Sequence, residues 1–165
     1  MTIHAEHPFA EPDDPVRRFR GRVGGAVAVV CAGEGADRAG LTVTQLQVAH
    51  GDPAHLLVLV DPDSDLADAV EDTDRLAVSL LTWEHRDLAE AFAGRAPAPG
   101  GMFRLGTWEQ TAWGPVLADA AGWAGGEVVG RSTVGWSLLL DAEVARVDVR
   151  DEEGLVHRRG RYQRP

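Results

Sequence analysis

The chain has 165 residues, of which 44% are hydrophobic and 25% charged, and it carries a formal net charge of −10. This length and composition are typical of one folded domain, and they exclude a disordered or collagen-like chain. The acidic balance argues against a general nucleic-acid binder, because such proteins neutralise phosphates with basic side chains.

All 16 basic residues, histidine aside, are arginine. The absence of lysine excludes Schiff-base chemistry and the lysine of a P-loop. The arginines gather in two clusters, over 17–22 and over 158–164, and each cluster taken alone is typical of a solvated face.

No apolar run approaches the roughly 18–20 residues that a membrane-spanning helix needs. Residues 1–14 hold acids and prolines but no apolar segment of a secretory signal. We therefore expect a flexible N-terminal arm over 1–14 and one domain over 15–165. The single cysteine, Cys31, cannot form an intrachain disulfide, and we expect it to be a small buried residue of a cytoplasmic protein.

The first half of the chain predicts short strands and three short helices. Helix starts are indicated by capping residues such as Asp14 before Pro15 and by Thr82, and strands by apolar or alternating runs. In chain order the expected elements are a helix from 15 that ends before the glycines at 24–25, strands over 26–31, 41–48 and 56–60, a helix from 61 through 70, a strand over 76–81 and a helix over 84–92.

The second half predicts a loop followed by further strands. Residues 95–106 are rich in glycine, proline and alanine, which is typical of a loop or lid. Strands are expected around 122–130, 134–149 and 155–162, joined by glycine turns and by an acidic turn over 151–154. Short strands with two or three peripheral helices indicate a mainly β fold built around a β-barrel rather than a βαβ sheet.

Familiar catalytic motifs are absent from this sequence. It contains no GxGxxG, P-loop, HExxH, paired CxxC or G-x-S-x-G motif. The six histidines are scattered, and His50 and His55 flank a turn without cysteine or acidic partners at ligand spacing. We therefore predict no metal site, and the motifs identify no catalytic residue.

Several segments in a fixed order match the motifs of one known family. They are GLTVTQL over 40–46, VAHGDP over 48–53, LLVLVD over 56–61, LAVSLL over 76–81, DLAEAF over 87–92, GPVL over 114–117 and RGRY over 159–162. Together these segments resemble the flavin reductase-like, FMN-binding split β-barrel family over most of the chain after Val16. The resemblance implies a Greek-key split β-barrel, usually an obligate homodimer, with FMN at the dimer interface.

The resemblance also implies a set of cofactor contacts. In it Thr42 meets the phosphate or ribityl chain, Thr44 and Gln45 meet the flavin ring, and the Ser64 hydroxyl lies at a helix start that suits a phosphate. The full set of implied contacts is Thr42, Thr44, Gln45, Ala49, His50, Asp61, Ser64 and Phe92. The residue types alone fit ordinary strand threonines at 42 and 44 equally well, and they favour a core role for Phe92.

Three positions depart from the pattern of the family. Residues 61–63 read Asp-Pro-Asp where the family often has a basic residue, and acids there repel a phosphate unless an arginine such as Arg38, or one from a second subunit, approaches. Gln45 and Ala49 stand where hydroxyl residues are expected. Residues 135–137 read Gly-Trp-Ser in place of a G-D-H element whose histidine is implicated in handling the pyridine nucleotide.

The resemblance implies an NAD(P)H-dependent flavin oxidoreductase that supplies reduced FMN, or FAD, with a flavin-dependent monooxygenase as a candidate partner. The cofactor carries the hydride in such chemistry, which accounts for the lack of an acid–base motif. The three departures favour an alternative, a split-barrel homodimer that binds flavin without turnover or has lost the cofactor. The sequence leaves both hypotheses open.

Overall fold

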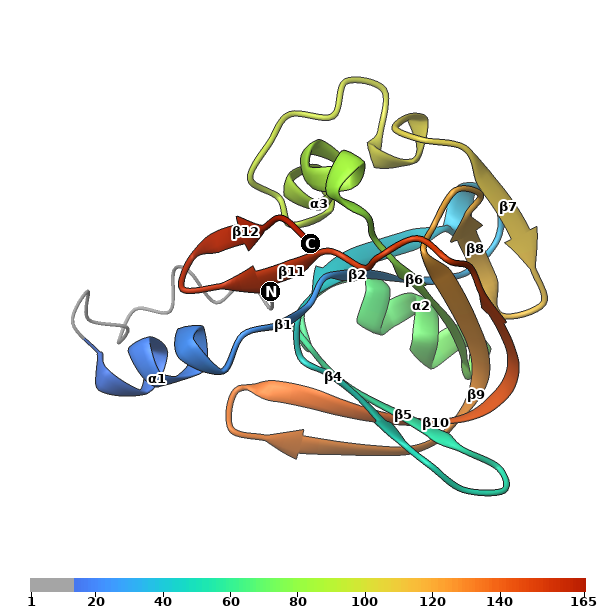
Figure 1. Ribbon diagram of the computed structural model, residues 1–165. Helices are drawn as coiled ribbons and strands as arrows, with labels where there is room; N and C mark the ends of the chain where they lie inside the picture. Colours follow the sequence, from blue (N-terminus) through green and yellow to red (C-terminus); the bar gives the residue numbers. More distant parts are fainter. Residues whose placement is uncertain (1–13) are drawn as a thin grey trace.

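The computed structural model describes residues 14–165, so the N-terminal arm expected over 1–14 lies, apart from Asp14, outside the described residues. The described chain is mainly β, with three α-helices placed around a curled sheet (Figure 1). The predicted mainly β fold class, a split β-barrel with two or three peripheral helices, is confirmed.

The elements are short, apart from one long hairpin. The α-helices are α1 (Pro15–Val23), α2 (Asp65–Thr73) and α3 (Arg86–Phe92), and the 3₁₀ turns are η1 (Gly35–Asp37), η2 (Trp83–His85) and η3 (Met102–Arg104). The strands are β1 (Gly25–Ala26), β2 (Ala28–Ala32), β3 (Ala39–Val43), β4 (Leu46–Ala49), β5 (His55–Val60), β6 (Arg75–Leu80), β7 (Trp108–Thr111), β8 (Gly114–Leu117), β9 (Gly122–Val134), β10 (Ser137–Val149), β11 (Val156–Arg158) and β12 (Arg161–Gln163).

Seven antiparallel strands form the main sheet, in the order β3-β2-β6-β9-β10-β5-β4. Strands β3 and β4 are consecutive in the chain, yet they lie at opposite edges of this sheet. Only Thr44 and Gln45 separate them, so the sheet must curl until its two edges almost meet. The Leu59 N–H donates to the Gln45 carbonyl oxygen at 3.1 Å and fastens this junction to β5. The β3–β4 junction therefore marks the split of the barrel.

Local patterns predicted most strands, but two expected strands have different boundaries and one hairpin was missed. The single strand expected over 41–48 is broken at the β3–β4 junction. The strand expected over 155–162 is the β11–β12 hairpin, because Arg159 and Gly160 turn the chain with φ values of 52° and 77°. The β7–β8 hairpin was not predicted as strands. The two strands expected around 122–149 are confirmed as one hairpin, β9–β10.

Strand β2 is buried on both faces, as its continuous apolar run predicted. Val30 packs in a cluster inside the curl, with α2 residues such as Leu66, whereas Val29 and Cys31 pack in a second cluster under α3. Figure 1 shows the same arrangement, with α2 inside the curl and α3 on the opposite side of the sheet. Burial raises the pKa of the Cys31 thiol well above its usual range, which agrees with the expected buried role.

Helix α1 is different from the other two helices. Asp14 caps it by accepting a hydrogen bond from the Val16 N–H at 2.9 Å, and Pro15 occupies its first turn as predicted. The helix ends at Gly24, whose φ of 63° favours glycine. No residue of α1 is buried, so its position depends on a few neighbouring contacts. Over residues 14–165, no helix combines the length and the apolar character that crossing a membrane requires.

Candidate functional site

A groove of about 430 Å³ lies where α1, the β11–β12 hairpin and the β3–β4 junction meet. This volume lies within the range of ligand pockets in proteins. The residues that line the groove are Arg17, Arg18, Arg20, Gly21, Arg22, Gly24, Thr44, Gln45, His157, Arg159 and Gly160. The segments that meet here are distant in the sequence, so the groove is a product of the tertiary fold.

A glycine allows the chain to pass close to the junction after α1. A Cβ atom at Gly25 would lie 2.3 Å from the carbonyl oxygen of Thr44, a distance that side chains do not tolerate. Only glycine therefore permits this approach of β1 to the β3–β4 junction. The approach places the end of α1 beside Thr44 and Gln45.

Thr44 and Gln45 are half-buried and line the groove. Within residues 14–165 neither side chain makes a hydrogen bond, although the Gln45 carbonyl oxygen is occupied by the Leu59 N–H. The Thr44 hydroxyl and the Gln45 amide can each donate and accept hydrogen bonds. The two side chains are thus available to a polar ligand.

Five arginines give the groove its charge. Arg17, Arg18, Arg20 and Arg22 come from α1, and Arg159 comes from the β11–β12 turn. No aspartate or glutamate is among the lining residues, and within residues 14–165 none of these arginines forms a salt bridge. Guanidinium groups match phosphate and carboxylate geometry. The arrangement therefore suits an anionic ligand.

Two hydrogen bonds fasten the hairpin to α1. The Arg159 N–H donates to the Gly21 carbonyl oxygen at 2.8 Å, and Arg158 Nε donates to the Arg22 carbonyl oxygen at 3.2 Å. These bonds join residues 136 or more positions apart and bring the two arginine clusters together. The arginines are exposed, as expected for solvated faces, but their convergence on one groove was not predicted.

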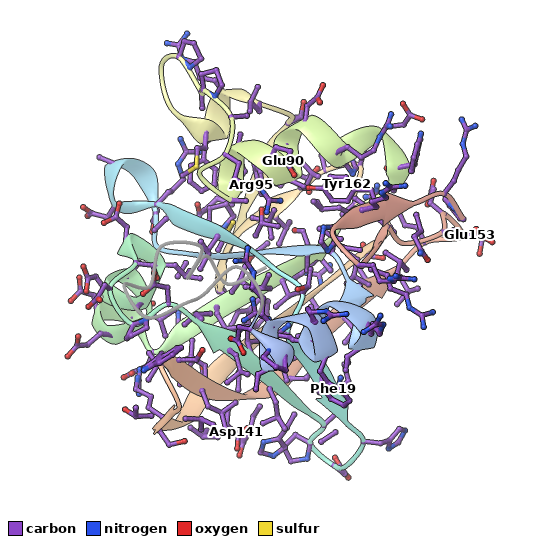
Figure 2. The ribbon with its side chains drawn as sticks, turned by 90° about the vertical axis from the view of Figure 1, so that its left-hand side faces the viewer. Phe19, Glu90, Arg95, Asp141, Glu153 and Tyr162 are labelled. Carbon is purple, nitrogen blue, oxygen red and sulfur yellow. The ribbon has the colours of Figure 1, made fainter. Side chains whose placement is uncertain are left out.

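His157 adds an imidazole to the groove wall. Partial burial holds the pKa of His157 below its usual range. Its ring packs edge-on against Tyr162, with ring centroids 5.3 Å apart. The Tyr162 hydroxyl in turn donates to a carboxylate oxygen of Glu90, which also accepts two hydrogen bonds from Arg95, at 2.7 and 2.9 Å. Figure 2 shows Glu90, Arg95 and Tyr162 gathered between α3 and the hairpin.

Two of the predicted cofactor contacts lie in the protein core. Thr42 is 1% exposed, and its hydroxyl donates to the Ala89 carbonyl oxygen at 2.7 Å. Phe92 is also 1% exposed, with its ring packed against Phe103 and Trp108 at centroid distances of 5.2 and 5.3 Å. In this subunit neither side chain lines the groove, and Phe92 has the core role that its helical pattern favoured.

Four other predicted contacts lie away from the groove. Ala49 and His50 are exposed at the far end of β4. Asp61 and Ser64 belong to the turn before α2, where the Ser64 hydroxyl donates to the Asp61 carbonyl oxygen at 2.7 Å and accepts from the Ala67 N–H at 3.2 Å. The Ser64 side chain thus caps α2. Of the eight predicted contacts, only Thr44 and Gln45 line the groove.

Arg38, which the sequence suggested as an arginine that could approach the phosphate, does not line the groove. Arg38 stacks on Phe103, with its guanidinium carbon 4.6 Å from the ring centroid, and donates through Nε to the Gly35 carbonyl oxygen at 3.0 Å. It is therefore engaged at η1. Over residues 14–165, no three His, Cys, Asp or Glu side chains gather in a way that could hold a metal ion.

Comparison with known proteins identifies the family. The sequence profile of the flavin reductase like domain matches residues 20–165. An FMN reductase (NADH), RutF 2, of Methylorubrum extorquens is 31% identical over 159 residues, which cover 95% of this chain and 91% of that protein. The reductase component of 4-hydroxyphenylacetate 3-monooxygenase of Pseudomonas aeruginosa is 27% identical over 144 residues, or 86% of this chain and 85% of that protein.

A solved structure supports the fold independently. The native-state structure of the flavin reductase PheA2 superposes with a TM-score of 0.84 at 21% identity, and the match covers 94% of this chain and 99% of that one. A match at this identity shows the split-barrel fold, and the sequence profile covers nearly the whole described chain. The chain therefore belongs to the flavin reductase-like domain family.

Proposed function

We propose that this protein is an NAD(P)H-dependent flavin oxidoreductase that binds FMN or FAD and supplies reduced flavin. The observation that carries this proposal is the groove in which Thr44 and Gln45 meet five arginines, in a chain that belongs to the flavin reductase-like family. Relatives that cover most of the chain are named NADH-dependent FMN reductases.

The residues of the groove fit a flavin. A flavin has a ring edge with hydrogen-bond donors and acceptors, and Thr44 and Gln45 can pair with both kinds of atom. It also bears at least one phosphate, and the groove arginines supply the charge for it. A bound flavin supplies the hydride-accepting ring, so the chain has only to bind, orient and shield its two ligands. No acid–base residue is required of the protein.

The other predicted contacts differ in how well they fit this proposal. Ala49 and His50 are exposed at the end of β4 and stay proposed contacts of a flavin held between two subunits. The Thr42 hydroxyl, the Ser64 hydroxyl and the Phe92 ring are engaged within their own subunit. Asp61 adds negative charge near α2, which disfavours a phosphate there. We therefore assign the flavin ring to Thr44 and Gln45 and the phosphate to the arginine groove.

We also propose a homodimer. An apolar stripe on α1, formed by Val16, Phe19 and Val23, is 73%, 72% and 68% exposed. Figure 2 labels Phe19 at the lower edge of this helix in that view. Further exposed apolar residues lie on the β9–β10 hairpin, at Val129, Val134, Trp136, Val147 and Val149. Exposed apolar surface of this kind marks interaction sites in soluble proteins.

A flavin-binding protein without turnover is the second candidate. Its support is the β9–β10 turn, where Gly135 and Trp136 precede Ser137 and no histidine is present. A flavin-dependent monooxygenase is the proposed consumer of the reduced flavin, because one relative is named as the reductase component of 4-hydroxyphenylacetate 3-monooxygenase. A measurement of NADH oxidation distinguishes the oxidoreductase from the flavin-binding protein without turnover.

The test is a pair of measurements on the purified full chain. The visible absorbance of flavin is recorded after FMN or FAD is added and the excess removed, and NADH oxidation is then followed with and without free flavin. Retained flavin together with NADH oxidation above the rate of free flavin supports the proposal. Retained flavin without oxidation supports the carrier, and a chain that neither retains flavin nor oxidises NADH contradicts both.

A further inference from the structure

A second pocket, of about 360 Å³, lies between the β7–β8 hairpin and the strands β9 and β10. Its size is within the range of small-ligand pockets in proteins. Figure 1 shows β7 and β8 on the side of the molecule opposite α1, and of the described residues none lines both this pocket and the arginine groove. The proposed flavin site therefore leaves the second pocket unexplained.

Strand β6 holds the β7–β8 hairpin in place beside this pocket. The Leu117 N–H donates to the buried Ser79 hydroxyl at 3.0 Å, and an Arg75 guanidinium nitrogen donates to the Ala112 carbonyl oxygen at 3.2 Å. These bonds fix the end of β8 and the turn between β7 and β8. The pocket is thus formed before a ligand binds, which lowers the cost of ordering its walls.

Two tryptophans form an aromatic floor in the pocket. The half-buried Trp113 ring lies against Gly125, where a Cβ atom would come within 2.7 Å of the indole Cδ2. The Trp123 ring is 6.4 Å from the Trp113 ring, centroid to centroid, and the guanidinium carbon of Arg146 lies 5.3 Å from the Trp123 centroid. Planar rings stack on tryptophan and arginine faces, so this floor favours a ligand with an aromatic ring.

Strand alternation brings charges of both signs to the same pocket. Arg146, Asp148 and Arg150 are alternate residues that run from β10 into the turn after it, and alternate residues of a strand share one face. Glu109 lines the pocket from β7. Within the described residues 14–165, none of these four side chains forms a salt bridge. Two positive and two negative groups offer nothing to a polyanion, whereas a ligand with one charge of each sign can pair with both kinds.

We propose that this pocket binds a zwitterion with an aromatic ring, the chemistry of a free aromatic amino acid. The ring packs on Trp113. The ligand carboxylate pairs with Arg146 and Arg150, because the guanidinium fork matches carboxylate geometry. The ligand ammonium donates to the carboxylates of Glu109 and Asp148. The site is separate from the flavin groove and does not depend on the proposed function.

Four small probes test which parts of the ligand the pocket recognises. L-Phenylalanine has the ring and both charges, 3-phenylpropionate lacks the ammonium, phenethylamine lacks the carboxylate and L-alanine lacks the ring. Each is titrated calorimetrically into the purified full chain. We expect L-phenylalanine to bind with a Kd below about 1 mM and at least about fivefold more tightly than the other three. A second probe that binds as tightly, or a Kd of L-phenylalanine above about 1 mM, overturns the proposal.

Charge variants assign the two ends of the ligand to their partners. Arg146→Gln/Arg150→Gln and Glu109→Gln/Asp148→Asn should each weaken L-phenylalanine binding at least about fivefold, because each removes the partners of one ligand charge. The control Arg104→Gln, at an exposed position on η3 outside the pocket, should match the wild type. Circular dichroism checks that each variant is folded, and Arg150→Gln alone repeats the test without disturbing the ring contact of Arg146. A folded variant of either pair that binds L-phenylalanine like the wild type overturns the proposal.

Competition with flavin distinguishes this pocket from the groove. Saturating L-phenylalanine should not displace flavin from the wild type, and the folded Arg146→Gln/Arg150→Gln variant should retain flavin as the wild type does, because the two sites share no described residue. Displacement of flavin by L-phenylalanine would place the amino acid in the arginine groove and overturn the proposal. A wild type that binds L-phenylalanine but neither retains flavin nor oxidises NADH refutes the proposed function alone, so the two failures are distinguishable.

Discussion

The hydroxyl of Tyr162 in the C-terminal hairpin donates a hydrogen bond to the carboxylate of Glu90 in α3, although the two residues are 72 positions apart. Arg95 holds the same carboxylate from the loop after α3. The Tyr162 ring also packs against His157, which lines the groove. The Tyr162–Glu90 hydrogen bond therefore links His157, in the wall of the groove, to helix α3.

The first prediction concerns the titration of Tyr162. Burial and the hydrogen bond to Glu90 raise the pKa of Tyr162 to about 12. Because the folded pKa lies above the ordinary value of about 10, this interaction stabilises the fold fully below pH ~10 and is lost as the pH rises through the folded pKa. The chain has one tyrosine, so phenolate absorbance reports this group alone.

Glu90→Gln should lower the Tyr162 pKa toward its ordinary value, because it removes the negative charge beside the phenol. Glu153→Gln, at an exposed acid in the turn before β11, is the matched control and should leave the titration unchanged (Figure 2). A wild-type midpoint near 10 would show that the Tyr162–Glu90 contact does not form in solution.

The second prediction separates the two threonines that the sequence could not distinguish. Thr42→Val removes a buried hydrogen bond and should destabilise the fold by about 0.5–1.5 kcal/mol, while flavin affinity stays unchanged. Thr44→Val should leave stability nearly unchanged and weaken flavin binding about 2- to 10-fold, the worth of one neutral hydrogen bond. Urea denaturation and flavin titration measure the two effects. Weaker flavin binding by a stable Thr42→Val variant would restore Thr42 as a contact.

The third prediction concerns the glycine that passes the β3–β4 junction. Gly25→Ala places a Cβ against the Thr44 carbonyl oxygen and should destabilise the fold by about 1–3 kcal/mol. Gly21→Ala should have the opposite sign, a gain of up to about 1 kcal/mol, because the nearest atom lies 3.9 Å away and alanine favours a helix. Urea unfolding midpoints compare the two variants, and equal shifts would argue against the close approach at Gly25.

The fourth prediction concerns the apolar stripe on α1. Phe19→Ser should shift the protein toward the monomer in sedimentation velocity, because it removes the largest exposed apolar side chain of α1. Its secondary structure should not change, since no residue of α1 is buried in its own subunit. Arg104→Ser, at an exposed position on η3, serves as the control. A Phe19→Ser variant that associates like the wild type would remove the stripe from the proposed dimer interface.

Several features of the fold could be predicted from the sequence because local chemistry determines them. Asp14 caps α1 and Pro15 begins it, since capping depends only on residues a few positions away, whereas the helix expected from 61 begins only at Asp65. The apolar run of β2 identified a strand buried on both faces. The order of the family segments likewise predicted the family, which the profile match over 20–165 confirmed.

The site itself was decided by the tertiary structure. Thr42 and Thr44 are two residues apart in one predicted strand, but the curl of the sheet buries Thr42 under α3 and breaks the strand at Thr44. The arginines of α1 and Arg159 share a groove only because backbone hydrogen bonds join segments at opposite ends of the described chain. Periodicity and capping determine the type of an element from near neighbours, whereas the meeting of two sheet edges depends on every strand between them. For that reason local patterns indicated the family and most of the elements, whereas the curl of the sheet brought Thr44, Gln45 and the arginines to one groove.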